Sequence, residues 1–144
     1  MNVDKSKGKL GILIPGMGAV GTTLIAGVFA INKGLSKPIG SLSQMGRIRI
    51  GKRDIDNKPL IKEVVDIHAL EDVVFGGWDV FEDNVYESAL HAEVIDKNML
   101  DELRPELEKI NPMKAVFDKR YAKRLEGTHI KKGGTKMDLA EALM

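Results

Sequence analysis

A glycine-rich loop between an apolar run and a helix pattern constrains this chain more than any other feature. Residues 16–21 read GMGAVG, a G-x-G-x-x-G pattern. The loop follows the mainly apolar residues 9–14 (KLGILI) and overlaps the first residues of 19–33 (AVGTTLIAGVFAINK). The first run predicts a short buried strand ended by Pro15, and the second predicts a helix that ends before Gly34. A strand, a glycine loop and a helix in this order are typical of a dinucleotide-binding βαβ unit.

Each glycine of this loop has a separate physical role. Gly16 permits the tight turn out of the strand, Gly18 lets a diphosphate approach the backbone, and Gly21 lets the helix lie close to the strand. The free N–H groups and partial positive charge of the helix start favour phosphate groups. The segment also fits a P-loop pattern up to Thr23, but Thr22 stands where the phosphate-binding lysine belongs, which disfavours NTP hydrolysis.

Short apolar runs and helix patterns alternate along the rest of the chain. Further strands are predicted within residues 39–50, at 73–75 (VVF) and at 115–117 (AVF), and further helices at 84–92, 96–109 and 136–144. Asp96 is the expected N-cap of the 96–109 helix, and Pro105 is expected to kink or split it. The alternation predicts an α/β fold, a Rossmann-like parallel sheet flanked by helices, with residues 1–144 as one domain.

The end of the chain gives a further expectation about this sheet. The helix pattern at residues 136–144 has no C-terminal stop signal, so we expect an incomplete, truncated dinucleotide-binding domain. A partly built sheet of this kind would expose a strand edge that favours association.

Composition excludes several other classes of protein. The 144 residues are 43% hydrophobic, which suffices for one packed core, and the absence of cysteine excludes disulfides, thiolate zinc sites and cysteine nucleophiles. The three histidines are isolated, so no metal site is predicted. A formal charge of +1 argues against nucleic-acid binding, and the apolar stretches are too short to span a membrane. Without a signal-peptide pattern, we expect a cytoplasmic protein.

The near-neutral total conceals a charge asymmetry. Residues 1–53 hold nine bases and one acid, a formal charge of +8, whereas the remaining residues carry −7. A positive segment of this kind favours an anionic ligand, although the bases also suit a solvated face balanced by acids elsewhere.

The position of the ribose-binding acid is open from the residues alone. A dinucleotide-binding unit usually has an Asp or Glu about 20 residues after the loop, but residues 21–53 contain none. In one interpretation a nearby arginine accepts the 2′-phosphate of NADP, the candidates being Arg47, Arg49 and Arg53. In the other, Asp79 supplies the acid, since it follows the 73–75 strand at the edge where such ligands bind. Asp79 could also simply cap the turn before the next helix. Trp78 beside it is expected to pack in the core rather than stack on a ligand.

Four segments together carry a family resemblance. They are GMGAVG at residues 16–21, PIGSL continuing to Gly46, FGGWD at 75–79 with Asn84, and PMKAVF at 112–117. In this order and spacing, the chain resembles the N-terminal, NAD-binding part of the myo-inositol-1-phosphate synthase (inositol-3-phosphate synthase) family, in its prokaryotic form. The resemblance covers essentially the whole chain, and FGGWD beside the glycine loop is more specific than either motif alone.

The resemblance implies an NAD-dependent isomerase of inositol and phospholipid biosynthesis. Members convert glucose 6-phosphate to 1D-myo-inositol 3-phosphate by an oxidation, an aldol ring closure and a reduction with the same tightly held NAD. The catalytic residues of the family lie in a later domain, so none is named here and this chain alone is expected to be inactive. The family also implies a homo-oligomer that acts on a sugar phosphate, with no nucleic-acid or membrane partner.

The resemblance also implies roles for particular residues. Asp79 would bind the adenosine ribose, which favours NAD over NADP, and Ala115 and Val116 would line the adenine side. The diphosphate would be held by the loop residues Gly16, Met17, Gly18, Ala19 and Val20, with Gly21 completing the cofactor-binding loop. Two other functions stay open from the residues themselves: a stand-alone nucleotide-binding or regulatory module, and an NADP-dependent reductase.

Overall fold

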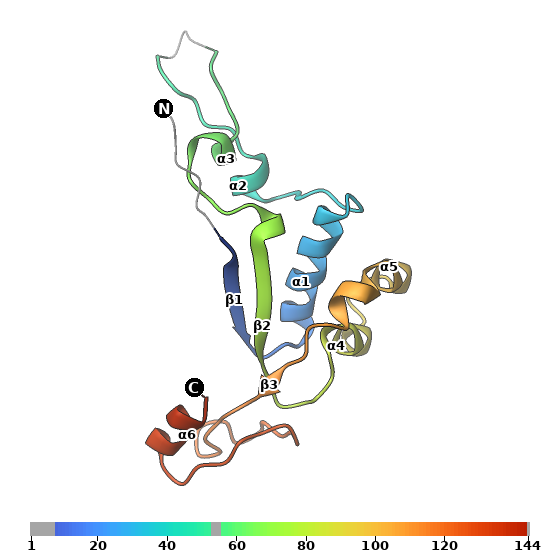
Figure 1. Cartoon of the computed structure of the whole chain (residues 1–144), viewed down its shortest axis with the longest axis vertical. Coiled ribbons are helices and arrows are strands. Elements are labelled where there is room, and N and C mark those ends of the chain that lie inside the picture. The colour runs from blue at the N-terminus through green and yellow to red at the C-terminus, as the bar shows by residue number, and fades with distance from the viewer. Residues whose placement is uncertain (1–7, 53–55, 144) are drawn as a thin grey trace.

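A three-stranded parallel sheet lies at the centre of the fold, which a computed structural model describes for residues 8–52 and 56–143 (Figure 1). The strands are β1 (Leu10–Pro15), β2 (Val73–Asp79) and β3 (Met113–Lys114), in the order β1-β2-β3. In the register of β1 with β2, Leu10 lies opposite Val73 and Ile14 opposite Gly77. The predicted α/β fold with a parallel sheet is confirmed, and β1 occupies an edge of the described sheet.

Three helices cover one face of this sheet. They are α1 (Ala19–Asn32), α4 (Val85–Ala92) and α5 (Lys97–Leu107), and Figure 1 shows all three on the same side. The chain moves in one direction across the sheet, from β1 to β2 to β3. Because parallel crossovers are right-handed, both connections must place their helices on the same face.

Gly34 and Asp96 lie at helix ends as predicted, and the structure adds Asn84, predicted as the first helical residue, as a cap. Gly34 follows the C-cap of α1 with a φ of 73°, a left-handed conformation that glycine adopts without strain. Asn84 caps α4 in a reciprocal pair with Glu87, and the Asp96 carboxylate caps the start of α5. Pro105 lies inside α5 and does not split it, since the helix continues to Leu107; it falls in the last turn, so little helix follows the proline.

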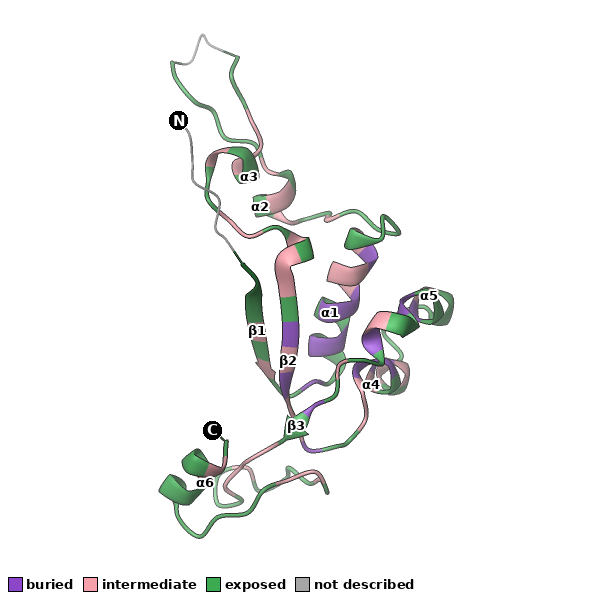
Figure 2. Ribbon diagram, in the orientation of Figure 1, coloured by how far each residue is buried: buried purple, intermediate pink, exposed green. Residues whose placement is uncertain are grey.

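The hydrophobic core lies between the sheet and these helices. Its members include Ile25 and Ala26 of α1, Ala89 of α4, Leu103 of α5 and Phe75 of β2. Alternate residues of the strands point the other way, where Leu13 is 60% exposed and Val74 is 50% exposed (Figure 2). The prediction of a buried first strand is therefore wrong, since no residue of β1 is fully buried. Ile12 and Ile14 are half-buried against the core, and no described helix covers the other face.

The segment between α1 and β2 departs from the predicted strand. Residues 39–50 contain the short helix α2 (Leu42–Met45). An arm follows, described for residues 47–52 and 56–60, in which the Ile48 N–H donates to the Pro59 carbonyl oxygen at 3.1 Å. The returning side of the arm leads into α3 (Ile61–Val64) and the 3-10 helix η1 (Leu70–Asp72). Arg47, Ile48, Arg49 and Ile50 alternate polar with apolar side chains over four residues, too short a run for a sheet strand. The two sides of the arm pair with each other instead of joining the sheet.

Two strands differ in extent from the predicted ones. β2 continues through both glycines to Asp79, and glycine is required at Gly77 because a Cβ there would lie 2.2 Å from the Ile14 oxygen. β3 (Met113–Lys114) begins two residues and ends three residues earlier in the chain than the predicted strand at 115–117, and Ala115 forms only an isolated parallel bridge with Ile130. The closing helix α6 (Lys136–Leu143) lies beyond the carboxyl end of the sheet, as Figure 1 shows.

The accessible surface of the molecule is large for its mass. It measures 10261 Å², whereas a compact monomer of this mass exposes about 7,300 Å². The excess agrees with the open face of the sheet, the protruding arm and the separate α6, which together leave much of the chain in contact with solvent.

Over the described part of the chain, no helix has both the length and the apolar character needed to cross a membrane.

Candidate functional site

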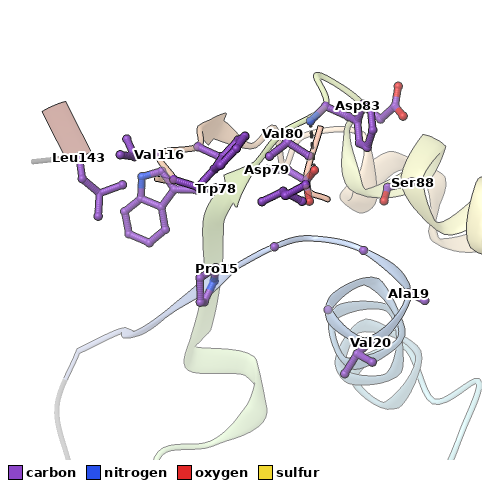
Figure 3. A pocket seen from close by; sticks show the side chains of 17 residues that line it. Pro15, Ala19, Val20, Trp78, Asp79, Val80, Asp83, Ser88, Val116 and Leu143 are labelled. Atoms are coloured by element: carbon purple, nitrogen blue, oxygen red, sulfur yellow. Dashed lines mark hydrogen bonds between the residues drawn. The ribbon is translucent and has the colours of Figure 1, made fainter. Parts of the chain in front are cut away.

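A pocket of about 770 Å³ opens at the carboxyl ends of the parallel strands (Figure 3). The loops that follow β1, β2 and β3 line it, and this is the edge where open α/β sheets bind their ligands. Its volume falls within the range of ~300 to ~1,000 Å³ that is typical of small-molecule and cofactor sites.

The glycine loop forms one wall of this pocket, and each of its three glycines has a different structural role. Gly16 has a φ of 94°, and its N–H donates to the Trp78 oxygen at 2.8 Å, which extends the sheet by one bond. A Cβ on Gly18 would meet nothing within 4 Å, so the backbone there is open to a ligand. A Cβ on Gly21 would lie 3.2 Å from the Gly16 oxygen, which agrees with close contact between α1 and the loop.

The start of α1 presents backbone N–H groups to the pocket. Ala19, Val20 and Gly21 belong to the first turn, so their N–H groups have no carbonyl four residues earlier within the helix. Among the described residues the structure records no other acceptor for these N–H groups, and all three residues line the pocket. Val20 is 87% exposed, so this end of the helix is open to an anion.

Asp79 lies at the end of β2, beside the glycine loop and on the pocket wall. Its Oδ2 accepts a hydrogen bond from the Met17 N–H at 2.6 Å, and its Oδ1 accepts one from the Phe81 N–H at 3.1 Å. Asp79 therefore does stabilise its own turn, but the cap of α4 is Asn84. An ionised carboxylate has about four acceptor positions, so two remain for a ligand.

Met17 differs from the other predicted loop residues. It does not line the pocket, because its side chain is 1% exposed and belongs to the hydrophobic core. Its N–H is bonded to Asp79, and its carbonyl oxygen accepts a hydrogen bond from the Ser88 hydroxyl at 2.8 Å.

The far side of the pocket is apolar. Ala115 and Val116, which follow β3, line this side, and the Ala115 N–H donates to the backbone carbonyl oxygen of Asp79 at 3.3 Å. Trp78 points to the open face of the sheet and lines the pocket, so the prediction that it packs in the core is wrong; Figure 3 shows it toward Val116 and Leu143. Sequence reasoning missed Leu143, because no local pattern brings α6 to the ends of the strands.

Two polar residues of the pocket were also missed. Ser88 of α4 and Asp83 of the loop before it line the side nearest the start of α1. Their positions depend on α4 lying against α1. Only the predicted order of strands and helices could have suggested this contact.

The candidate arginines for NADP do not reach this pocket. Arg47 and Arg49 lie on the arm beyond α2, at the amino ends of the strands, and Arg53 lies outside the described residues. The Arg47 guanidinium donates to the Lys58 oxygen of the same arm. Elsewhere in the basic segment, Lys33 pairs with Glu106 at 2.7 Å, which supports the interpretation that its bases are balanced by acids from other elements.

A charged pair follows the apolar side of the pocket in the chain. Beyond Phe117, the Arg120 guanidinium and backbone N–H both donate to Asp118, and these hydrogen bonds lower the pKa of that carboxyl to about 2. Asp118 thus stays ionised and paired at neutral pH. Within the described ranges, no three His, Asp or Glu side chains gather closely enough to hold a metal ion.

Comparison with known proteins shows a family that this chain matches in sequence and in fold. Residues 10–144 match the model for the NAD-binding segment of a family described as myo-inositol-1-phosphate synthase. The chain is 48% identical over 142 residues to inositol-3-phosphate synthase 1 of Bacteroides thetaiotaomicron, covering 98% of this chain and 32% of that protein. It is 33% identical to inositol-3-phosphate synthase isozyme 1 of Arabidopsis thaliana, covering 89% of this chain and 28% of that protein.

A solved structure agrees with the fold. The crystal structure of inositol-3-phosphate synthase from Caenorhabditis elegans matches with a TM-score of 0.80 at 22% identity, over 96% of this chain and 30% of that one. The chain thus spans about 30% of the length of the relatives that it matches. The predicted family resemblance and NAD as its cofactor are confirmed by these comparisons.

Proposed function

The chain belongs to the myo-inositol-1-phosphate synthase family, and we propose that it supplies the NAD-binding part of an inositol-3-phosphate synthase, with residues 1–144 acting as one cofactor-binding unit. One observation carries the proposal: the unbonded amides at the start of α1 and the Asp79 carboxylate line the same pocket. A dinucleotide needs these two features together, a donor set for its diphosphate and an acceptor for its ribose.

The diphosphate would lie against the glycine loop. The N–H groups of Ala19, Val20 and Gly21 would donate to its oxygens, and the positive end of the α1 dipole would add to the attraction. The space above Gly18 supports this arrangement, since a side chain there would occupy the path of the phosphates. Gly16 contributes the turn that aims these amides at the pocket.

The adenosine would occupy the β2 and β3 side of the pocket. Asp79 has acceptor positions left for the ribose hydroxyls, and Ala115 and Val116 offer apolar contact for the adenine. A carboxylate at this position also repels a 2′-phosphate, so we expect NAD to bind more tightly than NADP.

The whole protein would make inositol 3-phosphate, the product in the names of its relatives, and the family resemblance adds glucose 6-phosphate as its substrate. Bound NAD would supply reversible hydride transfer, and the role of this chain would be to hold and orient it. No residue of the chain is assigned to proton transfer or ring closure, so we expect no turnover from this segment alone. Assembly into a homo-oligomer and a cytoplasmic location belong to the same proposal.

The test is calorimetric titration of NAD into the complete natural polypeptide and its Asp79→Ala variant. Losing hydrogen bonds to a charged acceptor costs about 1.5 to 3 kcal/mol, which corresponds to an affinity about 10- to 150-fold weaker. Asp56→Ala is the matched control, because it removes the same group from the arm at the other end of the sheet. If Asp79→Ala bound NAD as tightly as the wild type, Asp79 would have no place in the site.

A further inference from the structure

Ser88 touches the glycine loop from a different helix, and we propose that it is a positioning residue for the diphosphate-binding amides. This inference rests on the proposed function and concerns how the loop is held, not which atoms contact the cofactor. The Ser88 hydroxyl donates to the Met17 oxygen at 2.8 Å, across 71 residues of sequence. Asp79 holds the N–H of the same residue at 2.6 Å, so both polar groups of Met17 are fixed from outside the loop.

Met17 is also fixed through its side chain. That side chain is 1% exposed and lies in the core with Ile25 and Leu103. Three independent anchors therefore meet at one residue: a carboxylate from the end of β2, a hydroxyl from α4 and the hydrophobic core.

The anchored residue sits between two glycines. Gly16 and Gly18 flank Met17, and glycine has more backbone freedom than any other residue. Without anchors, the backbone from Gly16 to Gly18 would sample many conformations beside the start of α1, and cofactor binding would have to overcome that conformational entropy. Holding Met17 on both sides orders this backbone before the ligand arrives, which strengthens binding without adding a contact.

The hydrogen bond of Ser88 is unusual for a serine inside a helix. Such a hydroxyl commonly bonds a carbonyl of the preceding turn of its own helix, here that of Asn84. Ser88 bonds the neighbouring loop instead, and α4 is held in place by Val85 and Ala89, each 1% exposed against the core. The donor is thus presented from a rigid support, and Ser88 also lies on the pocket wall.

The test compares three ligands on the complete natural polypeptide and its Ser88→Ala variant. Alanine suits a helix interior, so the variant should fold, and thermal unfolding verifies this. We expect affinities for NAD and for ADP-ribose to fall about 3- to 10-fold, as for the loss of one hydrogen bond. Affinity for adenosine, which has no diphosphate, should stay at the wild-type value. Hydrogen exchange at the Met17 and Gly18 amides should be faster in the unliganded variant.

Two further variants keep the inference falsifiable. Ser88→Thr retains the hydroxyl and should restore NAD affinity, while Ser43→Ala removes a helical serine hydroxyl from α2, far from the pocket, and should change nothing. Unchanged NAD affinity in Ser88→Ala would overturn the positioning role, as would an equal loss for NAD and adenosine. A wild-type protein that failed to bind NAD would instead overturn the proposed function itself.

Discussion

The two faces of the sheet differ although the same strands form both. On one face, α1, α4 and α5 bury Phe75 and a continuous cluster that includes Leu103 at 0% exposed. On the other face, Leu13 and Val74 are at least half exposed, and no described helix lies over them. Strand residues alternate between the two sides, so adjacent positions of β1 and β2 experience either a packed core or water.

This difference shows that the order in which the strands are connected determines which face of the sheet is packed. Because the connections from β1 to β2 and from β2 to β3 advance the same way, right-handed crossovers put every long helix of the core on one side. The stability of the described fold therefore comes from a single helix–sheet layer. The pocket lies at the end of that layer, and α1 and β2 supply both the core and the site.

The largest expected effect comes from replacing leucine by alanine on the packed face and on the open face of the sheet. Leu103→Ala removes a fully buried side chain and should lower the free energy of unfolding by about 2 to 5 kcal/mol. Leu13→Ala, on the open face, should lower it by no more than about 0.5 kcal/mol, since that side chain is already 60% exposed. Urea unfolding of the 144-residue chain measures both. Equal losses would mean that the open face is also buried in solution.

A smaller effect is expected from the cap that starts α4. Asn84 accepts a hydrogen bond from the Glu87 N–H at 3.0 Å, while the Glu87 carboxylate accepts one from the Asn84 N–H at 3.1 Å. Asn84→Ala should lower the free energy of unfolding by about 1 kcal/mol. Asn84→Ser, which keeps the capping oxygen, is the control. If Asn84→Ala left the unfolding midpoint unchanged, the start of α4 would contribute little to the helical layer.

The smallest effect concerns pH and the contact between α4 and α5. Hydrogen bonds from Tyr86, at 2.6 Å, and from Lys97 hold the pKa of Asp101 below its usual value of 3.8. A lowered folded-state pKa stabilises the fold above the usual value, and this contribution is lost as the pH falls through the folded-state pKa. Asp101→Asn should therefore weaken the loss of thermal stability that occurs as the pH falls below the usual carboxyl pKa of 3.8.

A second variant examines the same contact from its partner. Tyr86→Phe removes the donor that contributes most to the lowered pKa of Asp101, so it should reduce the pH dependence in the same direction. If thermal unfolding of both variants depended on pH as in the wild type, the Tyr86–Asp101 hydrogen bond would not be the source of that pH dependence.

Local features of the sequence were enough for the elements that surround the site. The glycine loop, α1 with its Gly34 stop, and the caps at Asn84 and Asp96 all follow from short-range rules of backbone conformation and hydrogen bonding. The predicted end of β2 was too early, because Gly77 weakens a strand locally and only the close approach of Ile14 explains why glycine stands there.

The sequence by itself determined the glycine loop, α1 and the positions of α4 and α5, because those preferences depend on residues within one or two turns of each other. It did not determine the conformation of residues 39–50, where the predicted strand is absent. Only the tertiary structure decided which face of the sheet stays open, that Arg47 and Arg49 lie outside the pocket, and that one residue of the loop is held from two sides. The bonds from Asp79 and Ser88 to Met17 span 62 and 71 residues. No local pattern encodes such contacts, because they exist only once β2 and α4 have packed against β1 and α1.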